Sequence, residues 1–394
     1  MAADAIVITA QKDITVCLYW SLSPWRNKFW RRTVKITDVT TTTVNMPFVW
    51  KDFPKSARPS RVVLIVRVTT DEGIIGIGES SASLEGAPAT MKAVENMIKP
   101  MVVGKDPMAV DAIWNEVFHA FYYAGRGGIT VSALSGVEMA LWDIKGKALN
   151  VPVYQLLGGP AHDKLRAYAS LAHYTKLEDI TTACEKVVEM GFTALKLHEV
   201  DVASVAAGRK AAGDEIDIMV DVNCRWSVVD AIRMGREFET YNLYWFEEPI
   251  FPIDDYVGLA EVKASLSMPI ASGENEYTVR GFNGLIEKRA VDYLQPSVSK
   301  IGGISQQKKV FTLAGAFNRS VVPWGWAIGP AQAAMLQVCF SDPDAFLIET
   351  PVDVTEANLF VKPVAAEKGF WKLPEGPGLG IELDEKVVKR YTLK

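Results

Sequence analysis

From residue 161 to residue 350, short apolar runs alternate with amphipathic stretches. The apolar runs lie at 165–171, 194–200, 216–222, 244–248, 270–274, 293–298, 321–324 and 346–349. Between them, stretches such as 177–190 and 228–241 place apolar residues with the period of an amphipathic helix. Eight strand–helix units of roughly 25 residues each are typical of a (β/α)₈ barrel, an α/β fold. A doubly wound parallel sheet is the alternative, but it would seldom contain eight such even units.

The pattern is different between residues 34 and 160. Three segments rich in β-branched residues predict strands, at 34–44, 61–70 and 74–79. Three segments with helical periodicity follow, at 87–102, 107–123 and 131–149. This part therefore predicts an α+β domain with an antiparallel sheet. The segment 351–394 contains a Pro/Gly turn cluster at 374–380, and we expect it to return to the N-terminal sheet.

Residues 1–33 differ from the rest of the chain. Trp20, Trp25 and Trp30 alternate there with arginines and lysines. Such a segment can bind membranes or anionic partners. We favour the alternative that it is an atypical N-terminal extension, either an oligomer arm or a misplaced start.

Composition narrows the function. The net charge of −5 gives no support to nucleic-acid binding. The four cysteines lack paired spacing, which argues against a zinc knuckle or a disulfide framework and fits a reducing compartment. No signal peptide is visible, and no apolar run approaches the ~20 residues that cross a bilayer. We therefore expect a cytoplasmic protein with no membrane partner.

Ionisable residues end several of the predicted barrel strands. Lys196 and His198 are two apart on one strand, so their side chains share a face. Asp221, Glu247 and Glu274 each follow an apolar run on the next three strands. One such residue would often be only a strand end that meets solvent. Four strands with the same feature favour a functional site at the C-terminal face of the barrel.

Three carboxylates from neighbouring strands suit a hard cation such as Mg²⁺. Zinc would prefer His or Cys, and neither occurs at those three positions. Asn223 shares the face of Asp221 and is expected to orient a ligand or contact the substrate. Glu248 points the other way, so we expect it to support the site from behind, and Cys224 is interpreted as a structural thiol.

A metal ion opposite a nitrogen base favours one reaction type. The metal stabilises an enediolate while the base removes a proton α to a carboxylate. A protonated Lys196 would disfavour the imidazolium form of His198, which would leave His198 neutral and able to accept a proton.

Several motifs together resemble the enolase superfamily, in its mandelate racemase/muconate lactonizing enzyme group and mandelate racemase subgroup. The motifs are GVEMALWDIKG at 136–146, LLGG at 156–159, KLH at 196–198, DVN at 221–223, EEP at 247–249, SGE at 272–274 and KIGG at 300–303. The resemblance covers nearly everything from Val34 onward. It implies a capping domain (34–160) over a modified (β/α)₇β TIM barrel (161–350), Mg²⁺, a small-molecule carboxylate substrate, and a homo-oligomer, either a dimer or an octamer.

The resemblance also implies roles for individual residues. Asp221, Glu247 and Glu274 match the metal ligands. His198 stands where the family usually has a second lysine as base, and Lys196 matches the lysine that tunes the base and contacts the substrate carboxylate. Which of these two residues is the base stays open. Glu349 matches a glutamate on the eighth strand that hydrogen-bonds the substrate carboxylate.

The chain departs from the family at a second catalytic group. The subgroup usually has a His–Asp dyad on the opposite face of the substrate, and here Ser297 and Trp324 stand at those positions. No histidine follows His198 in the sequence. Racemisation by two bases therefore lacks its second base. Lys300 is interpreted as a structural or ion-pairing lysine.

A one-base reaction is still compatible with these residues. We expect syn-dehydration of an acid sugar to a 2-keto-3-deoxy acid. The alternatives are an isomerase, either a cycloisomerase or an epimerase, and a non-catalytic metal-binding relative. Loops at 46–60 and 125–128 are expected to close over the substrate.

Several further residues are expected near the substrate. Besides Glu349 and Asn223, we expect contacts from Trp324, Trp50 and Ser297. Trp50 and Phe53 would make the pocket more apolar than a sugar acid favours. Trp326, His173 and Tyr174 are weaker candidates.

Overall fold

The computed structural model describes residues 34–51, 53–56, 59–352 and 354–393. The extension proposed for residues 1–33 lies outside this part of the chain. Within it, no helix has the length and apolar character that a membrane crossing requires.

A curled sheet of eight parallel strands forms the larger part of the molecule. Its order is β10-β9-β8-β7-β6-β5-β4-β11. The strands are β4 (Lys164–Ser170), β5 (Ala194–Leu197), β6 (Asp217–Asp221), β7 (Trp245–Glu247), β8 (Ile270–Ser272), β9 (Tyr293–Leu294), β10 (Ser320–Val321) and β11 (Leu347–Pro351). Each overlaps one predicted apolar run, so the predicted barrel is confirmed.

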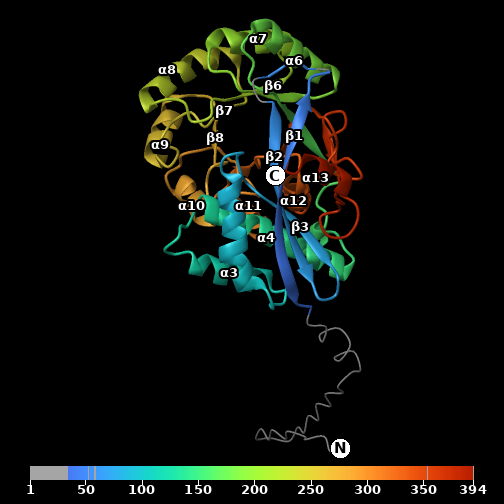
Figure 1. The fold of residues 1–394 in the computed structure, drawn as a ribbon. Helices are drawn as coiled ribbons and strands as arrows, with labels where there is room; N and C mark the ends of the chain where they lie inside the picture. The colour runs from blue at the N-terminus through green and yellow to red at the C-terminus, as the bar shows by residue number, and fades with distance from the viewer. Residues whose placement is uncertain (1–33, 52, 57–58, 353, 394) are drawn as a thin grey trace, which may run out of the picture.

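One α-helix joins each pair of successive barrel strands. These helices are α6 (Leu177–Glu189), α7 (Val202–Ala212), α8 (Val228–Phe238), α9 (Tyr256–Ser265), α10 (Thr278–Glu287), α11 (Ile304–Ala316) and α12 (Pro330–Phe340). Seven helices between eight strands make a (β/α)₇β barrel. Figure 1 shows α6 to α10 following one another around the outside of the curled sheet.

The inside of the barrel is filled by a layer of buried side chains. It is formed by Tyr168, Ala194, Met219, Trp245, Ala271, Val322 and Leu347. Successive residues of a strand face opposite sides, so Leu195 and Phe246 instead join the core between sheet and helices. The residues two positions beyond this layer therefore point inward again, just above the apolar layer.

The N-terminal domain is an antiparallel sheet with helices. Strands β1 (Ile36–Val49), β2 (Ser60–Thr70) and β3 (Ile75–Ser80) pair in that order. The helices are α1 (Ala87–Lys92), the π-helical η2 (Ala93–Ile98), α2 (Lys99–Val102), α3 (Val110–Ala120), α4 (Ile129–Leu149) and α5 (Val153–Leu156). The single helix predicted over 87–102 is thus interrupted by a π-helical stretch. Pro100 has no N–H to donate to the turn before it, which favours a change of winding there.

Helix α4 of the N-terminal domain connects this domain to the barrel and is buried on nearly all sides. Glu138 on this helix accepts hydrogen bonds from the backbone N–H groups of Ile304 (2.7 Å) and Ser305 (2.9 Å). These are the first residues of barrel helix α11, where free N–H groups favour a carboxylate. The capping domain is therefore tied to the barrel through its core.

The C-terminal segment reaches both parts of the molecule. Strand β12 (Val354–Thr355) pairs with β1, and β13 (Phe370–Lys372) pairs with β4. Helix α13 (Glu385–Tyr391) is anchored by an ion pair of 3.0 Å between Glu385 and Arg67 on β2. In Figure 1 the red C-terminal segment accordingly lies beside the blue N-terminal strands.

Close packing of β3 on α4 predicts a stability effect. A Cβ atom at Gly78 would lie 2.0 Å from the carbonyl oxygen of Gly136, so backbone would have to move. We expect Gly78→Ala to lower the free energy of unfolding by about 1–3 kcal/mol, measured by chemical denaturation. Gly315→Ala in α11 is the control, because the nearest atom to its Cβ would be 3.7 Å away. Equal stability of Gly78→Ala and wild type would contradict this packing.

Candidate active site

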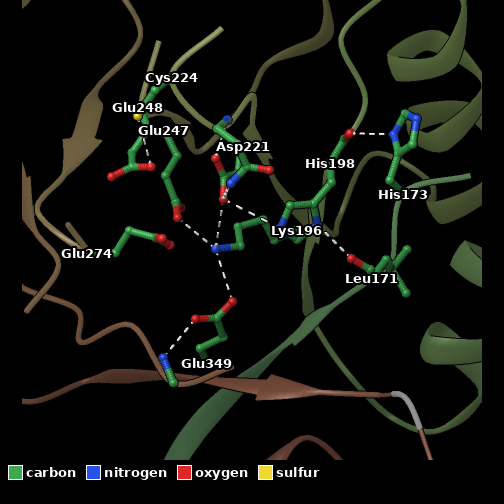
Figure 2. Close-up of polar contacts among 12 residues, drawn as sticks. Leu171, His173, Lys196, His198, Asp221, Cys224, Glu247, Glu248, Glu274 and Glu349 are labelled. Carbon is green, nitrogen blue, oxygen red and sulfur yellow. Dashed lines mark hydrogen bonds and ion pairs between the residues drawn. The ribbon is translucent and has the colours of Figure 1, made fainter. Parts of the chain in front are cut away.

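The polar residues predicted at the strand ends lie directly above the apolar layer of the barrel. Lys196, Asp221, Glu247 and Glu349 each follow a residue of that layer by two positions, so all four point inward. Glu274 follows Ala271 by three, because Gly273 adopts a positive φ of 131° just after β8 and turns the chain. Figure 2 shows these five side chains converging on one region.

Lys196 is fully buried and surrounded by carboxylates. Its Nζ lies 2.7 Å from Glu247, 3.0 Å from Glu349 and 3.6 Å from Asp221. Burial alone would lower the pKa of Lys196, but these carboxylates raise it well above its usual value. Lys196 is therefore a buried cation.

Three carboxylates lie close enough together to bind one metal ion. Asp221, Glu247 and Glu274 each offer an oxygen, and the three oxygens lie within 4.8 Å of one another. Burial raises the pKa of Glu247 to about 8, although Lys196 opposes the shift. The pKa of Asp221 falls to about 2, because Lys196 and His198 outweigh the effect of its burial.

His198 is fixed through both ring nitrogens. Its Nδ1 lies 2.6 Å from the carbonyl oxygen of Leu171, at the end of β4. Its Nε2 lies 3.4 Å from Asp221. Burial lowers the pKa of His198, as does Lys196, but the hydrogen bond and charge of Asp221 outweigh them, and the net shift is upward. Lys196 thus disfavours the imidazolium form, as expected from the sequence, but Asp221 opposes it, so the expected help toward a neutral His198 is not the net effect.

The backbone after β6 is shaped around Asp221. The side chain of Asp221 accepts hydrogen bonds from the N–H of Asn223 at 2.8 Å and from its Nδ2 at 3.0 Å. Asn223 and Cys224 both have positive φ, and the local bonds to Asp221 support this conformation. Glu248 lies behind the cluster and accepts hydrogen bonds from Cys224 and Asn275.

A cavity of about 690 Å³ opens above these residues. On the barrel side it is lined by His173, His198, Asp221, Asn223, Glu274, Lys300, Trp324 and Trp326, among others. The N-terminal domain contributes the other side of the lining, with Ser56, with Ser60 and Arg61 at the start of β2, and with Ser81 and Ser83 in the segment after β3.

The wall opposite His198 carries cations and aromatic rings. Lys300 Nζ lies 3.2 Å from Glu274 and 4.7 Å from the ring centre of Trp324. The guanidinium of Arg61 lies 4.5 Å from the ring centre of Trp326 and 5.6 Å from that of Trp324. Lys300 is thus an ion-pairing lysine, and Trp324 lines the cavity.

Three residues expected at the substrate lie elsewhere. Ser297 is buried, with its hydroxyl 3.3 Å from that of Ser299, and it does not line the cavity. Trp50 packs on Phe48 with ring centres 5.8 Å apart and is also absent from the cavity wall. Phe53 is buried in the core instead. The pocket is therefore less apolar on the capping side than the aromatic residues of this loop suggested.

The carboxylate of Glu349 is occupied by contacts with other residues of the protein. Besides Lys196, it accepts a hydrogen bond of 2.8 Å from the N–H of Gly325. It is fully buried beneath the cavity, so in this structure it contacts Lys196 and does not line the cavity wall.

Sequence reasoning missed several contributors to the site. The carbonyl of Leu171 is a backbone group, so the residue type at this position gives no sign of its role. Arg61 and the serines belong to the other domain, and only the tertiary fold brings them to the barrel. His173 carried a weak signal, because it follows the first barrel strand.

Comparison with known protein families agrees with this geometry. Residues 32–158 match the mandelate racemase/muconate lactonizing enzyme N-terminal domain, and residues 179–387 match the enolase C-terminal domain-like family. The chain belongs to the enolase superfamily. Members of this superfamily generally use Mg²⁺.

Relatives of this superfamily member share most of its length. It is 31% identical to a D-galactarolactone cycloisomerase from Agrobacterium fabrum over 84% of this chain and 92% of the relative. It is also 31% identical to an arabinonate dehydratase from Saccharolobus solfataricus, over 84% of this chain and 91% of the relative. A solved mandelate racemase-like structure from Bordetella bronchiseptica RB50 is 32% identical, with a TM-score of 0.85 over 92% of this chain and 95% of that one. The protein is thus an enzyme of dehydratase or isomerase type, which sets aside the non-catalytic alternative.

Removing one carboxylate of the cluster tests its role. We expect Glu274→Gln to weaken Mg²⁺ binding at least about tenfold, measured by isothermal titration calorimetry, because an amide oxygen carries no charge. Glu85→Gln is the control, since Glu85 lines the same cavity outside the cluster. Unchanged Mg²⁺ affinity in a folded Glu274→Gln variant would remove Glu274 from the ligand set.

Proposed function

We propose that this enzyme is Mg²⁺-dependent and dehydrates an acid sugar to a 2-keto-3-deoxy acid, with His198 removing the proton α to the carboxylate. The observation that carries the proposal is the placement of His198, which lines the cavity with Nε2 beside Asp221 and Nδ1 on the carbonyl of Leu171.

The contact with Leu171 selects the tautomer of His198. A carbonyl oxygen can only accept a hydrogen bond, so Nδ1 carries the hydrogen. In the neutral ring the lone pair is then on Nε2. Nε2 is therefore the atom that takes up the α-proton.

Lys196 is unsuited to act as the base. Its charge is stabilised by three buried carboxylates, and loss of its proton would leave those charges uncompensated. We therefore assign it to charge balance at the metal cluster and to attraction of the substrate carboxylate.

The carboxylates of Asp221, Glu247 and Glu274 fit Mg²⁺. An octahedral ion with ligands at about 2.1 Å holds oxygens up to about 4.2 Å apart, so oxygens within 4.8 Å need only a small inward shift. When bound, Mg²⁺ would supply positive charge that stabilises the substrate carboxylate as the α-proton leaves.

Among the residues that the structure describes, the cavity wall across from His198 has no His–Asp dyad for a two-base racemisation. Ser297 and Trp324 stand at the corresponding ends of β9 and β10, and the chain has no histidine beyond His198. A reaction on one face of the α-carbon is therefore favoured, as in syn-elimination of a β-hydroxyl.

The residues that line the cavity favour a hydroxylated substrate. Four serines contribute to its capping side, and hydroxyl groups both donate and accept hydrogen bonds. The relatives named for arabinonate and galactarolactone act on acid sugars or their lactones. A lactone cycloisomerase is the second candidate, because the same base and metal could open a lactone ring by elimination.

An NMR screen in D₂O tests the proposal. The enzyme is incubated with Mg²⁺ and a panel of aldonates, aldarates and their lactones. A 2-keto-3-deoxy product would support the dehydratase. A ring-opened product would instead support the cycloisomerase, and absence of both α-deuteration and product across the panel would contradict both.

The base assignment gives a separate prediction. We expect His198→Ala to lower α-proton exchange at least about 10²-fold while Mg²⁺ affinity stays close to that of wild type, because His198 is no member of the carboxylate cluster. Exchange is measured by deuterium incorporation. His119→Ala, on the exposed face of α3, is the control. Survival of exchange in His198→Ala would transfer the role of base to another residue.

A further inference from the structure

A second histidine lies beside His198 on the cavity wall and is oriented by a buried carboxylate. His173 follows β4, and its Nδ1 lies 2.8 Å from the carbonyl oxygen of His198 and 3.2 Å from Glu199. Figure 2 shows the ring of His173 next to the backbone of His198. Glu199 is buried, and its other oxygen accepts a hydrogen bond of 2.9 Å from the N–H of Tyr174.

These contacts determine which ring nitrogen of His173 carries a hydrogen. Both groups at Nδ1 are acceptors, so Nδ1 carries a hydrogen and the ring exchanges its other proton at Nε2. The carboxylate of Glu199, 3.2 Å from Nδ1, fixes the orientation of the ring. Glu199 is held in place from two sides, so it is a positioning residue for His173.

His173 and His198 belong to one wall of the same cavity. They follow the adjacent strands β4 and β5, which pair in parallel, and both line the cavity. The side chain of His173 is 48% exposed, whereas that of His198 is 19% exposed. His173 therefore reaches solvent more easily and can regain a proton between turnovers.

We propose that His173, oriented by Glu199, is a second catalytic residue that donates a proton from Nε2 to the leaving β-hydroxyl. The inference rests on the proposed dehydration. It relieves His198 of acting first as base and then as acid within one turnover.

The proposed step balances in atoms and electrons. Nε2 of His198 takes the α-proton, and the electrons of that C–H bond first pass into the substrate carboxylate, which gives the enediolate. In a second step they form the Cα–Cβ double bond as the Cβ–O bond breaks. The hydroxyl takes the proton of His173 and leaves as water. The enol that remains tautomerises to the 2-keto acid. His198 then releases its proton to solvent, and His173 takes one up.

The test separates proton donation from packing. Asn at position 173 can place its Nδ2 near the position of the histidine Nδ1 and donate to the same acceptors, but it has no nitrogen that transfers a proton. We expect His173→Asn to lower formation of the 2-keto-3-deoxy acid by about 10²–10⁴-fold, using the acid sugar that wild type dehydrates in the NMR screen. Exchange of the α-proton should stay close to that of wild type.

A substrate analogue whose leaving group needs no proton should restore the activity of the His173→Asn variant. Fluoride departs as an anion, so the 3-deoxy-3-fluoro analogue of the same acid sugar should be converted by His173→Asn at close to the wild-type rate. Glu199→Gln should show the same selective loss in weaker form. His119→Asn is the matched control on exposed helix α3.

Two outcomes would overturn the inference while the proposed function stands. One is a parallel loss of α-exchange, dehydration and fluoride elimination in His173→Asn, which would indicate a structural role. The other is wild-type dehydration in this variant. If wild type itself neither exchanges the α-proton nor forms product, the proposed function fails and this inference fails with it.

Discussion

The burial of Lys196 inside the barrel is the constraint on which the site depends. A fully buried ammonium is tolerated only where opposite charges and hydrogen-bond acceptors surround it. Glu247, Glu349 and Asp221 provide them within 3.6 Å. The same carboxylates would repel one another without this cation. The lysine and the acidic cluster therefore require each other.

Charge counting around Lys196 explains why the cluster suits a divalent ion. In their ionised forms, Asp221, Glu247, Glu274 and Glu349 would carry four negative charges, against the two positive charges of Lys196 and Lys300. Two negative charges are left in a region of low exposure. The raised pKa of Glu247 reflects burial and neighbouring carboxylates that Lys196 alone does not offset. One divalent cation would offset these two charges.

Much of this arrangement could be predicted from sequence because it follows the two-residue period of strands. That period places Lys196, Asp221, Glu247 and Glu349 on the inner face, and the eight apolar runs locate the strands that carry them. The capping side could not be predicted in the same way. Trp50 suggested an aromatic pocket, but its ring packs against Phe48. The serines that line the cavity carry no periodic signal and reach it only through the docking of two domains.

The surroundings of the proposed base also support the proposed reaction on one face of the substrate. The two histidines of the cavity wall, His173 and His198, lie beyond the ends of β4 and β5. Across the cavity, Trp324 and Trp326 lie against Arg61, and Lys300 is paired with Glu274. Arginine holds its proton too firmly for acid–base catalysis, and indole rings do not accept protons. The two histidines thus lie on one side of the cavity and the aromatic rings and cations on the other, an asymmetry that fits the proposed elimination better than inversion of configuration at the α-carbon.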